Sequence, residues 1–425
     1  MTTISGARRV TSVRRFALLA AVGCCLALAA CTSNTASPGT GGSNTTTAQA
    51  SAPPCPGPAA SGQTVKVGIQ WPEAAEVSLP QLGASANAAV DYANQCLGGV
   101  GGHPVTVDKC TTDEGNTATA TACGNQFVQD KVAAAIVTIT AMGATLVPIV
   151  TGAGIPYIDS GGTSIAESLD KTGLVFSVSG GTAAVLGAMA LQAKNEGIKK
   201  VALLTIDSGA AGVQGLAGIP FGKAGVTPDV ISVPTGTPDM TPYLQAALSS
   251  GAGATVVLGD ATLCISYLQA ARAIDPTGKH WIISTCIATN VVQAVGATAL
   301  NGATVFGGTS VNSNDSQTVL YRSVMAKYSP ATPIGGFTPT GYQVVMSFIR
   351  GMAGFSGNAT AVSIADTMKA TKNIVSPVGY GTTFGCSTHP LPPLTVCSSQ
   401  TVVGTMNGAN VTNVKLVDAG PLFAG

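Results

Sequence analysis

The chain has 425 residues, enough for two ordinary domains or one large one. Only 9% of its residues are charged and 45% are apolar, a composition that excludes a disordered chain. The formal net charge is +1, and removal of an N-terminal segment with four arginines would leave a slightly acidic remainder. We therefore expect no basic surface that could bind a nucleic acid.

The first 30 residues are typical of an export signal. Four arginines precede an apolar run, Phe16 to Ala30, that is too short and too rich in Ala for a stable transmembrane anchor. The run ends in Leu28-Ala29-Ala30-Cys31, which resembles the bacterial lipobox and implies cleavage before Cys31 and a diacylglycerol on its sulfur. Plain secretion after a small-residue cleavage site is the alternative. No later apolar run approaches the length of about 18–20 residues that spans a bilayer.

Residues 31–61 contain almost no large apolar side chain and are dominated by Thr, Ser, Gly, Ala and Pro. Such a composition predicts a flexible tether with Pro-stiffened parts. We therefore expect a lipidated tether that holds an extracytoplasmic globular body at the outer face of the cell membrane.

Eight of the 11 cysteines remain once Cys24 and Cys25 leave with the signal and Cys31 carries lipid. An even number in an exported chain favours disulfides. We expect four bonds, each between neighbours in the order of strands and helices given below: Cys55–Cys96, Cys110–Cys123, Cys264–Cys286 and Cys386–Cys397. A metal site near His389 is the alternative, but the chain has no CxxC motif, and we expect no metal and no cofactor.

From residue 64 onward, short β-branched runs alternate with segments of helical period. In the first part of this body we expect strands at 65–69, 105–107, 133–137 and 155–159, and helices at 82–97, 117–129 and 143–151. The pattern then restarts with helices at 182–195, 211–223, 243–248 and 263–273, and strands at 201–206, 230–233, 255–258 and 281–284. A strand at 304–309, helices at 316–328, 340–354 and 361–370, and antiparallel strands within 379–417 complete it.

This alternation of strands and helices predicts parallel sheets covered by helices on both faces. The units are too numerous for one open sheet and fall into two similar halves that meet near residue 180. The predicted fold class is therefore α/β, with two doubly wound parallel-sheet lobes. A closed barrel of eight βα units is the architectural alternative.

Four segments, in this order along the chain, carry a resemblance to a known family. They are residues 88–105, where a helix ends in Asn and Gly-Gly before a Gly-His-Pro step, and residues 135–160, 233–248 and 340–345. Together they resemble the type I periplasmic solute-binding proteins, in particular the branched-chain amino acid (Leu/Ile/Val)-binding subfamily of ABC importers. The resemblance covers essentially all of residues 64–418.

The resemblance implies two lobes joined by three crossovers that form a hinge around a bound ligand. We place the crossovers near Ser177–Gly181, Thr309–Asn312 and Val378–Thr382. Lobe 1 would comprise residues 62–178 and 312–378, and lobe 2 residues 179–311 and 379–420. The ligand would lie between the lobes, beyond the carboxyl ends of the strands.

The resemblance also implies two loops that bind a ligand carboxylate. The first, with Ala141 and Met142, would present backbone N–H groups at a helix N-terminus, although the serine that the family often has there is missing. The second would use the amide of Gly162, together with Thr163 and the hydroxyl of Ser164. The alternative is that these residues only form the turns and cap the next helices.

An amino-acid ligand also needs an acid to pair with its ammonium group. The position at which the family has this acid aligns near Cys286, so Glu76, Asp207 and Asp260 are the candidate substitutes. Asp207 and Asp260 are equally expected as helix N-caps, and Glu76 as a solvated loop charge. Amides, short carboxylic acids and other small polar metabolites therefore all stay open as ligands.

The sequence lacks the motifs of an enzyme. Asp159-Ser160-Gly161-Gly162 resembles a serine-protease nucleophile segment only superficially, because none of the three histidines has the context of a triad and no GxSxG elbow is present. No Walker loop or GxGxxG motif follows a strand. We predict a protein that binds a small polar ligand and delivers it to the permease and ATPase subunits of an ABC importer. A ligand sensor of the same fold coupled to a signalling partner, and a structural cell-envelope lipoprotein, are the alternatives.

Overall fold

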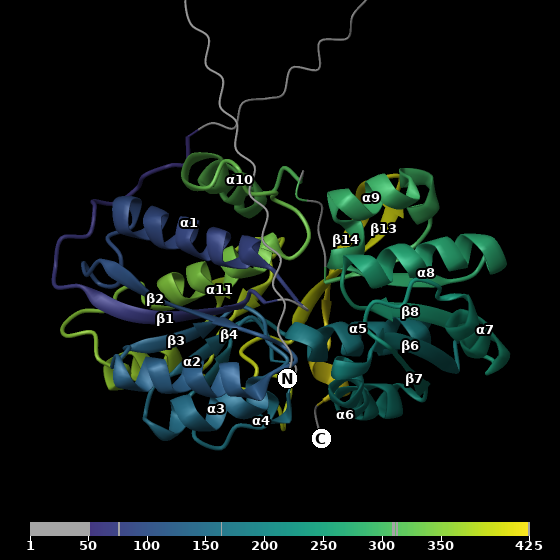
Figure 1. The fold of residues 1–425 in the computed structure, drawn as a ribbon, viewed down its shortest axis with the longest axis horizontal. Coiled ribbons are helices and arrows are strands. Elements are labelled where there is room, and N and C mark those ends of the chain that lie inside the picture. The colour runs from purple at the N-terminus through teal and green to yellow at the C-terminus, as the bar shows by residue number, and fades with distance from the viewer. Residues whose placement is uncertain (1–51, 75–76, 163, 308–310, 312, 424–425) are drawn as a thin grey trace, which may run out of the picture. The chain divides into compact units, whose positions relative to one another are not determined.

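Two separate large sheets organise the fold (Figure 1). The computed structural model describes residues 52–74, 77–162, 164–307, 311 and 313–423. We call the part built on the five-stranded sheet the first lobe and the part built on the seven-stranded sheet the second lobe. Both sheets are open, so the predicted pair of doubly wound lobes is confirmed and a closed barrel is excluded.

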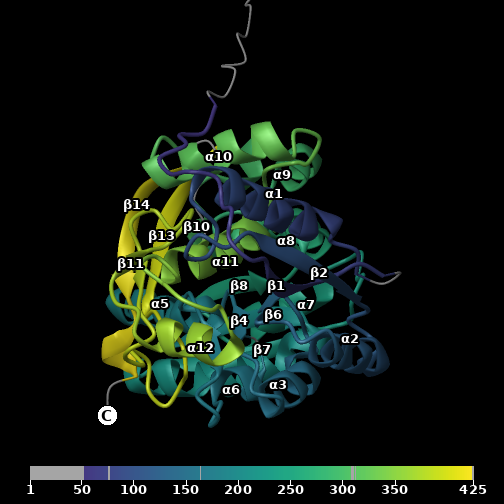
Figure 2. The same cartoon turned by 90° about the vertical axis from the view of Figure 1, so that its left-hand side faces the viewer.

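The sheet of the first lobe is parallel throughout, in the order β2-β1-β3-β4-β5. Helices pack on both of its faces, and α10 lies beside α1 in both views (Figures 1 and 2). The strands are β1 (Val65–Pro72), β2 (Val105–Thr112), β3 (Ala134–Val137), β4 (Tyr157–Asp159) and β5 (Val175–Ser177). The helices are α1 (Pro80–Cys96), α2 (Thr117–Gln129), α3 (Gly143–Gly152), α4 (Ile165–Ser168), α10 (Ser316–Tyr328), α11 (Thr338–Gly351) and α12 (Ala361–Lys369).

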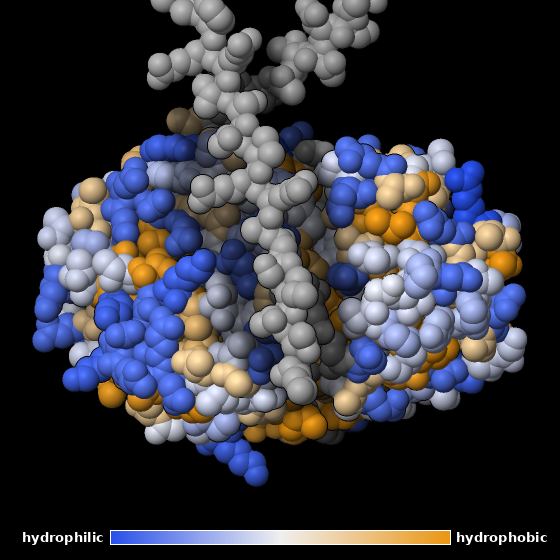
Figure 3. Space-filling view, in the orientation of Figure 1, coloured by the Kyte–Doolittle hydropathy of each residue, from blue (hydrophilic) through white to orange (hydrophobic). Residues whose placement is uncertain are grey.

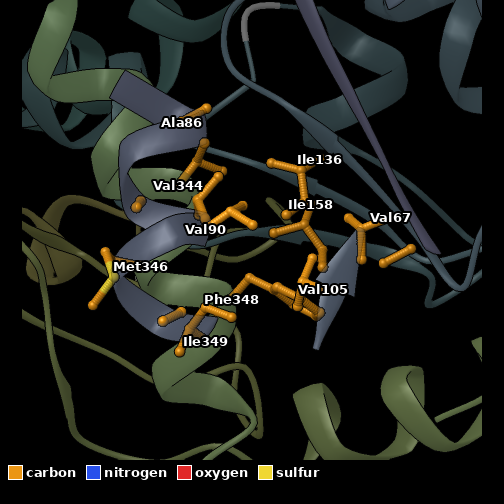
Figure 4. Close-up of a cluster of buried hydrophobic side chains, with 14 of the residues drawn as sticks. Val67, Ala86, Val90, Val105, Ile136, Ile158, Val344, Met346, Phe348 and Ile349 are labelled. Atoms are coloured by element: carbon orange, nitrogen blue, oxygen red, sulfur yellow. The ribbon is translucent and has the colours of Figure 1, made fainter. Parts of the chain in front are cut away.

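The main core of this lobe lies between the sheet and the helices α1 and α11. Figure 4 shows Val90 of α1 and Val344 and Phe348 of α11 gathered with Ile136 and Ile158 of the sheet, all of them buried. Burial of each such side chain contributes about 1.5–3 kcal/mol. The regular spacing of apolar residues in the sequence is the cause of this packing.

The helices α1 and α11 touch through their backbones. A Cβ atom at Gly341 would collide with the carbonyl oxygen of Leu82, so only glycine permits this approach. The hydroxyl of Ser85 donates to the carbonyl oxygen of Thr338 at 2.6 Å. This contact fixes the start of α11, which lines the cavity described below.

The sheet of the second lobe has the order β14-β13-β10-β9-β8-β6-β7. Its first five strands in the chain are parallel, and β13 and β14 add an antiparallel edge. The strands are β6 (Lys200–Ile206), β7 (Thr227–Val233), β8 (Ala254–Leu258), β9 (His280–Ile283), β10 (Thr304–Phe306), β13 (Gln400–Asn407) and β14 (Asn410–Asp418). The helices are α5 (Gly181–Asn195), α6 (Asp207–Ala224), α7 (Thr241–Ser249), α8 (Ala261–Ile274) and α9 (Thr289–Val295), with short 3-10 turns at Ser284–Ile287, Ala297–Leu300 and Gly420–Leu422. Among the described residues, no helix combines the length and the apolar character needed to cross a bilayer.

The first connection between the lobes runs from β5 to α5. Gly161, after β4, and Gly181, at the start of α5, lie so close that a Cβ atom on either would meet the backbone of the other. Both residues have a positive φ, which glycine adopts without strain. The hydroxyl of Ser179 donates to the carbonyl oxygen of Ser160. The predicted second connection, Thr309–Asn312, falls mainly on residues outside the described part of the chain.

The third connection lies further along the chain than the sequence predicts. Residues 378–382 are not a crossover but the turn of a small hairpin between β11 (Ile374–Val375) and β12 (Thr383–Phe384). Phe384, Cys386 and Cys397 are buried in the core of the first lobe, so the predicted start of lobe 2 at residue 379 does not hold for them, whereas Leu391 and Leu394 between them are buried in the core of the second lobe. Val396 forms a parallel bridge with Ser177 of β5, and the chain enters the second sheet only at β13.

The described end of the predicted tether is bound to the body of the protein. Cys55 is disulfide-bonded to Cys96, the amide of Gly57 donates to the carbonyl oxygen of Cys96 at 2.9 Å, and the amide of Ala60 donates to that of Asn94 at 2.7 Å. The hydroxyl of Tyr92 donates to the carbonyl oxygen of Pro54. Residues 52–61 are therefore bound to the C-terminal end of α1, and the prediction of a flexible tether does not hold for them.

The four disulfides of the structure are the four predicted pairs: Cys55–Cys96, Cys110–Cys123, Cys264–Cys286 and Cys386–Cys397. Each bond joins elements that are neighbours in space. Cys110–Cys123 ties β2 to α2, and Cys264–Cys286 ties α8 to the turn after β9.

We predict that the double variant Cys264→Ala/Cys286→Ala loses about 3 kcal/mol of unfolding free energy, because the unfolded chain is no longer constrained by a closed loop of this length. Denaturant unfolding under non-reducing conditions measures the loss. Peptide mapping of unreduced wild-type protein that finds free thiols at both positions would contradict the prediction.

Candidate functional site

The carboxyl ends of the parallel strands are where a doubly wound fold holds its ligands. In the first lobe, residues 138–142 follow β3, and residues 160–162 follow β4, the neighbouring strand, which ends at Asp159. In the second lobe, Asp207 follows β6 and Asp260 follows β8, and these strands are also neighbours. The predicted site residues that the structure describes therefore lie at strand ends, as two pairs of adjacent loops. Glu76, Thr163 and Cys31 lie outside the described residues.

The first loop is occupied by a carboxylate of the protein itself. The amide of Ala141 donates to Glu114 Oε2, and the hydroxyl of Thr140 donates to the same oxygen at 3.1 Å. A third donor, the hydroxyl of Thr112, reaches Glu114 Oε1 at 2.7 Å. The amide of Met142 donates to Thr140 Oγ1 at 2.9 Å. The N–H groups predicted for a ligand carboxylate thus already have acceptors.

The second loop is held in the same way. The amide of Gly161 donates to Asp159 Oδ1 at 2.7 Å, and the amide of Ser164 donates to Glu167 Oε2 at 2.9 Å. Ser164 is the N-cap of α4, since its hydroxyl accepts from the amide of Glu167 and completes a capping box. A Cβ atom on Gly162 would collide with the side chain of Glu167. The capping alternative from the sequence thus describes the position of Ser164 in this structure.

The carboxyl groups of Asp159 and Glu167 belong to buried residues, which are only 3% and 2% exposed. Burial raises the pKa of Asp159 to about 7, and the negative charge of Glu167 adds to this shift. The amides of Gly161 and Gly162 oppose it. The hydroxyl of Tyr157 donates to Glu167 Oε1 at 2.7 Å, and burial raises the pKa of this tyrosine well above its usual value. The loop therefore rests on a buried pair of acids, one of which titrates near neutral pH.

Ser160 is not arranged as a nucleophile. Its hydroxyl donates to the carbonyl oxygen of Thr138 at 3.1 Å. His103 contacts the carbonyl oxygens of Gln63 and Gly357, and His280 contacts Tyr267 and Asp275. These contacts join His103 to segments distant in the chain and His280 to α8 and the end of that helix, so neither histidine is paired with Ser160.

The two candidate acids of the second lobe, Asp207 and Asp260, both lie at the N-termini of helices. Asp260 is the N-cap of α8 and accepts from the amide of Leu263 at 2.8 Å. Asp207 is the exposed first residue of α6 and accepts from the hydroxyl of Thr235 at 3.0 Å. An acid in the first helical turn is stabilised by the helix dipole. A substitution at Asp260 would therefore lower stability by about 1 kcal/mol through the lost cap, whatever it does to binding.

A cavity of about 290 Å³ opens between elements of both lobes. The second lobe contributes residues from the end of β9, from α9, from the end of β10 and from the turn between β13 and β14. The first lobe contributes the start of α11 and the turn before it. Polar side chains from the two lobes line this space: Ser284, Thr289, Gln293, Thr340 and Gln343. Its apolar side chains are Ile287, Val292, Val311, Pro339, Val378 and Ala409.

The predicted site residues that the structure describes are absent from the lining of this cavity. The sequence nevertheless contained a signal, because Gln343 lies in the Thr340-Gly-Tyr-Gln segment that helped to identify the family and directly precedes the apolar Val344 and Val345. Lining residues such as Ser284, Gly335 and Gly336 have no comparable feature in the sequence that would mark them as part of a binding site. Gln293 and Thr289 belong to α9, a helix that the sequence pattern does not predict.

A second, smaller hollow of about 120 Å³ lies between α4 and α6 and is almost wholly apolar. Ile165, Leu169 and Ile219 are exposed there, Ile165 by 66%. Figure 3 shows apolar residues gathered at the lower rim, over these two helices. The space is smaller than the usual range for small-molecule sites.

Two α/β lobes with a cavity lined by residues of both define the architecture of a two-lobed binding protein. The sequence profile of the periplasmic binding protein family matches residues 64–400, and the chain belongs to this family. No curated protein matches the chain by sequence.

Solved structures with the same fold include two amino-acid-binding proteins and one that holds an aromatic acid. A leucine-binding protein from Thermotoga maritima has 18% identity and a TM-score of 0.67, over 84% of this chain and 99% of its own. A branched-chain amino acid transporter substrate-binding protein from Streptococcus pneumoniae, in complex with isoleucine, has 20% identity and a TM-score of 0.63, over 84% and 100%. A solute-binding protein of an ABC transporter from R. palustris, in complex with benzoate, has 18% identity and a TM-score of 0.67, over 84% and 96%.

We predict that the acid at position 159 makes the wild-type protein less stable as the pH rises from about 4 to about 7. In this window the unfolded chain has released the proton of Asp159 while the folded protein still holds it. Unfolding therefore releases a proton, and the free energy of unfolding falls as the pH rises. Asp159→Asn mimics the protonated acid and should lack this component. Unfolding free energies of both proteins between pH 4 and 8 measure the difference.

Asp366→Asn is the control, since it removes an exposed acid whose described ion pair, with Lys369, lies at the surface, and it should change the pH profile far less than Asp159→Asn does. Parallel pH profiles of wild-type protein and Asp159→Asn would disprove the prediction.

Proposed function

We propose that this protein is an extracytoplasmic, lipid-anchored solute-binding protein that captures a small polar ligand between its lobes and delivers it to an ABC importer. The observation that carries the proposal is the cavity lined by both lobes in a chain that belongs to the periplasmic binding protein family. The solved relatives are substrate-binding proteins, which supports a binding role without catalysis.

Capture would depend on a hinge. A ligand that contacts α11 in the first lobe and α9 in the second stabilises the arrangement in which both contacts are made, because it binds that arrangement more tightly than any other. The close contact between Gly161 and Gly181, with the hydrogen bond from Ser179 to Ser160, holds the two lobes together at the first connection while the rest of the cleft changes its width.

The anchor would be the lipid on Cys31, in front of the polar segment that follows it. Since residues 52–61 are bound to α1, the stretch that separates the membrane from the body is shorter than residues 31–61. Permease and ATPase subunits would be separate chains, since no Walker loop is present in this sequence.

We expect at least one small solute to stabilise the mature chain. Thermal unfolding would be followed against a panel of amino acids, carboxylates, neutral amides and polyols, and a true ligand at a hundredfold excess over its dissociation constant adds about 2.7 kcal/mol. Small-angle scattering with that solute should give a smaller radius of gyration, because closure of the lobes makes the protein more compact. A panel in which nothing stabilises the protein would refute the proposed function and favour the structural lipoprotein.

Lipidation gives a separate prediction. Cys31→Ala should abolish incorporation of labelled fatty acid and move the protein from the membrane fraction to the soluble fraction, because the acyl chains are lost. Cys24→Ala and Cys25→Ala are matched controls, as both cysteines lie in the segment that is removed, and neither change should affect labelling. Undiminished labelling of Cys31→Ala would show that the anchor lies elsewhere.

A further inference from the structure

The described lining of the cavity between the lobes offers a ligand no charged side chain. None of the described residues that line it is ionisable, and its polar groups are hydroxyls, amides and the backbone of Gly307, Gly335 and Gly336. A carboxylate or ammonium group that enters such a site loses its hydration without gaining an opposite charge, which is strongly unfavourable. An uncharged molecule incurs no such cost.

The places at which a carboxylate would be expected are already filled. Glu114 accepts from Ala141 and Thr140 in the first loop, and Asp159 and Glu167 accept from the amides of the second. An incoming anion would compete with these internal side chains for the same donors, and the negative charges among them would repel it. The two loops therefore reject the group that they were predicted to bind.

Arg322, which contacts the backbone of a lining residue, is bound to the chain itself. Arg322 donates from Nη1 to the carbonyl oxygens of Val311 at 2.8 Å and Ser313 at 2.6 Å. Val311 lines the cavity, and its carbonyl oxygen accepts a hydrogen bond from the guanidinium group of Arg322. Arg322 thus holds the connecting chain and is not a member of the lining.

Resting on the proposed binding function, we infer that the ligand is a small uncharged molecule with amide or hydroxyl groups, held between Gln343 of the first lobe and Gln293 of the second. Each side-chain amide provides two N–H donors and one carbonyl acceptor, which match the groups of a neutral amide or polyol. Ile287, Val292 and Pro339 provide contact for a short apolar part. The volume of about 290 Å³ is at the lower end of ligand sites and suits a compact molecule.

The test uses pairs of compounds that differ only in charge. Calorimetric titration of the mature chain compares isobutyramide with isobutyrate, and benzamide with benzoate, with valine as the zwitterion and erythritol as a polyol. We expect the neutral member of at least one pair, or erythritol, to bind at least tenfold more tightly than every charged compound. The thermal panel above, sorted by charge, should yield only neutral ligands.

Variants locate the site. Gln343→Leu and Gln293→Leu should each weaken binding of the neutral ligand at least tenfold, since each removes one amide from one lobe. Gln245→Leu is the matched control, because Gln245 is an exposed residue of α7 outside the cavity, and its affinity should be that of the wild type. Gln293 is exposed, so its substitution is compatible with folding even if that of the half-buried Gln343 is not.

The outcomes separate the two proposals. Tighter binding of valine, benzoate or isobutyrate than of the neutral compounds would overturn the inference and leave the binding function intact. Binding of a neutral ligand that survives in both Gln variants would overturn the assignment to this cavity. If none of these compounds binds and nothing in the thermal panel stabilises the protein, the proposed function itself fails.

Discussion

The carboxylates that fill the loops after β3 and β4 are the constraint on which recognition in this protein depends. Helix starts and strand ends leave N–H groups without backbone partners, and each needs an acceptor. Glu114, Asp159 and Glu167 supply acceptors from within the chain. An N–H group that is satisfied internally is no longer a receptor for an anion. In this structure the two loops therefore act as parts of the lobe, and this is why we propose that other residues select the ligand.

In the second lobe, too, acidic side chains at strand ends accept hydrogen bonds from within the protein. Asp260 holds the start of α8, and Asp207 lies in the first turn of α6, where a negative charge is favoured by the helix dipole. Residue types that bind a charged ligand are the types that stabilise helix starts, so one side chain at a strand end can serve either purpose. Here the hydrogen bonds to Leu263 and Thr235 give the local purpose a direct physical basis.

The sequence predicted what depends on local order along the chain. Apolar runs such as 201–206 and 255–258 became central strands, and cysteines in adjacent βα units became disulfide partners, because consecutive units of a parallel sheet are neighbours in space. The sequence did not predict the features that depend on contacts between residues far apart in the chain. Glu114 and Ala141 meet only through the pairing of β1 with β2 and β3, and Phe384 and Cys397 stay in the first lobe through packing that no local pattern reveals. The cavity is the extreme case, since residues more than 100 positions apart line it together.

A neutral ligand would suit a hinge that must both close and open again. A net hydrogen bond contributes about 0.5–1.5 kcal/mol, and roughly twice as much when one partner is charged. If Gln293 and Gln343 each bind the ligand from their own lobe, the free energy that favours closure is the sum of a few such bonds and a small apolar contact. This sum is large enough to shift the population of closed molecules by orders of magnitude, yet small enough for a partner that binds the open form to reverse it. A buried ion pair with the ligand would add strength, but removal of either charge would then be very costly. An uncharged cavity thus permits capture and release with the same few contacts.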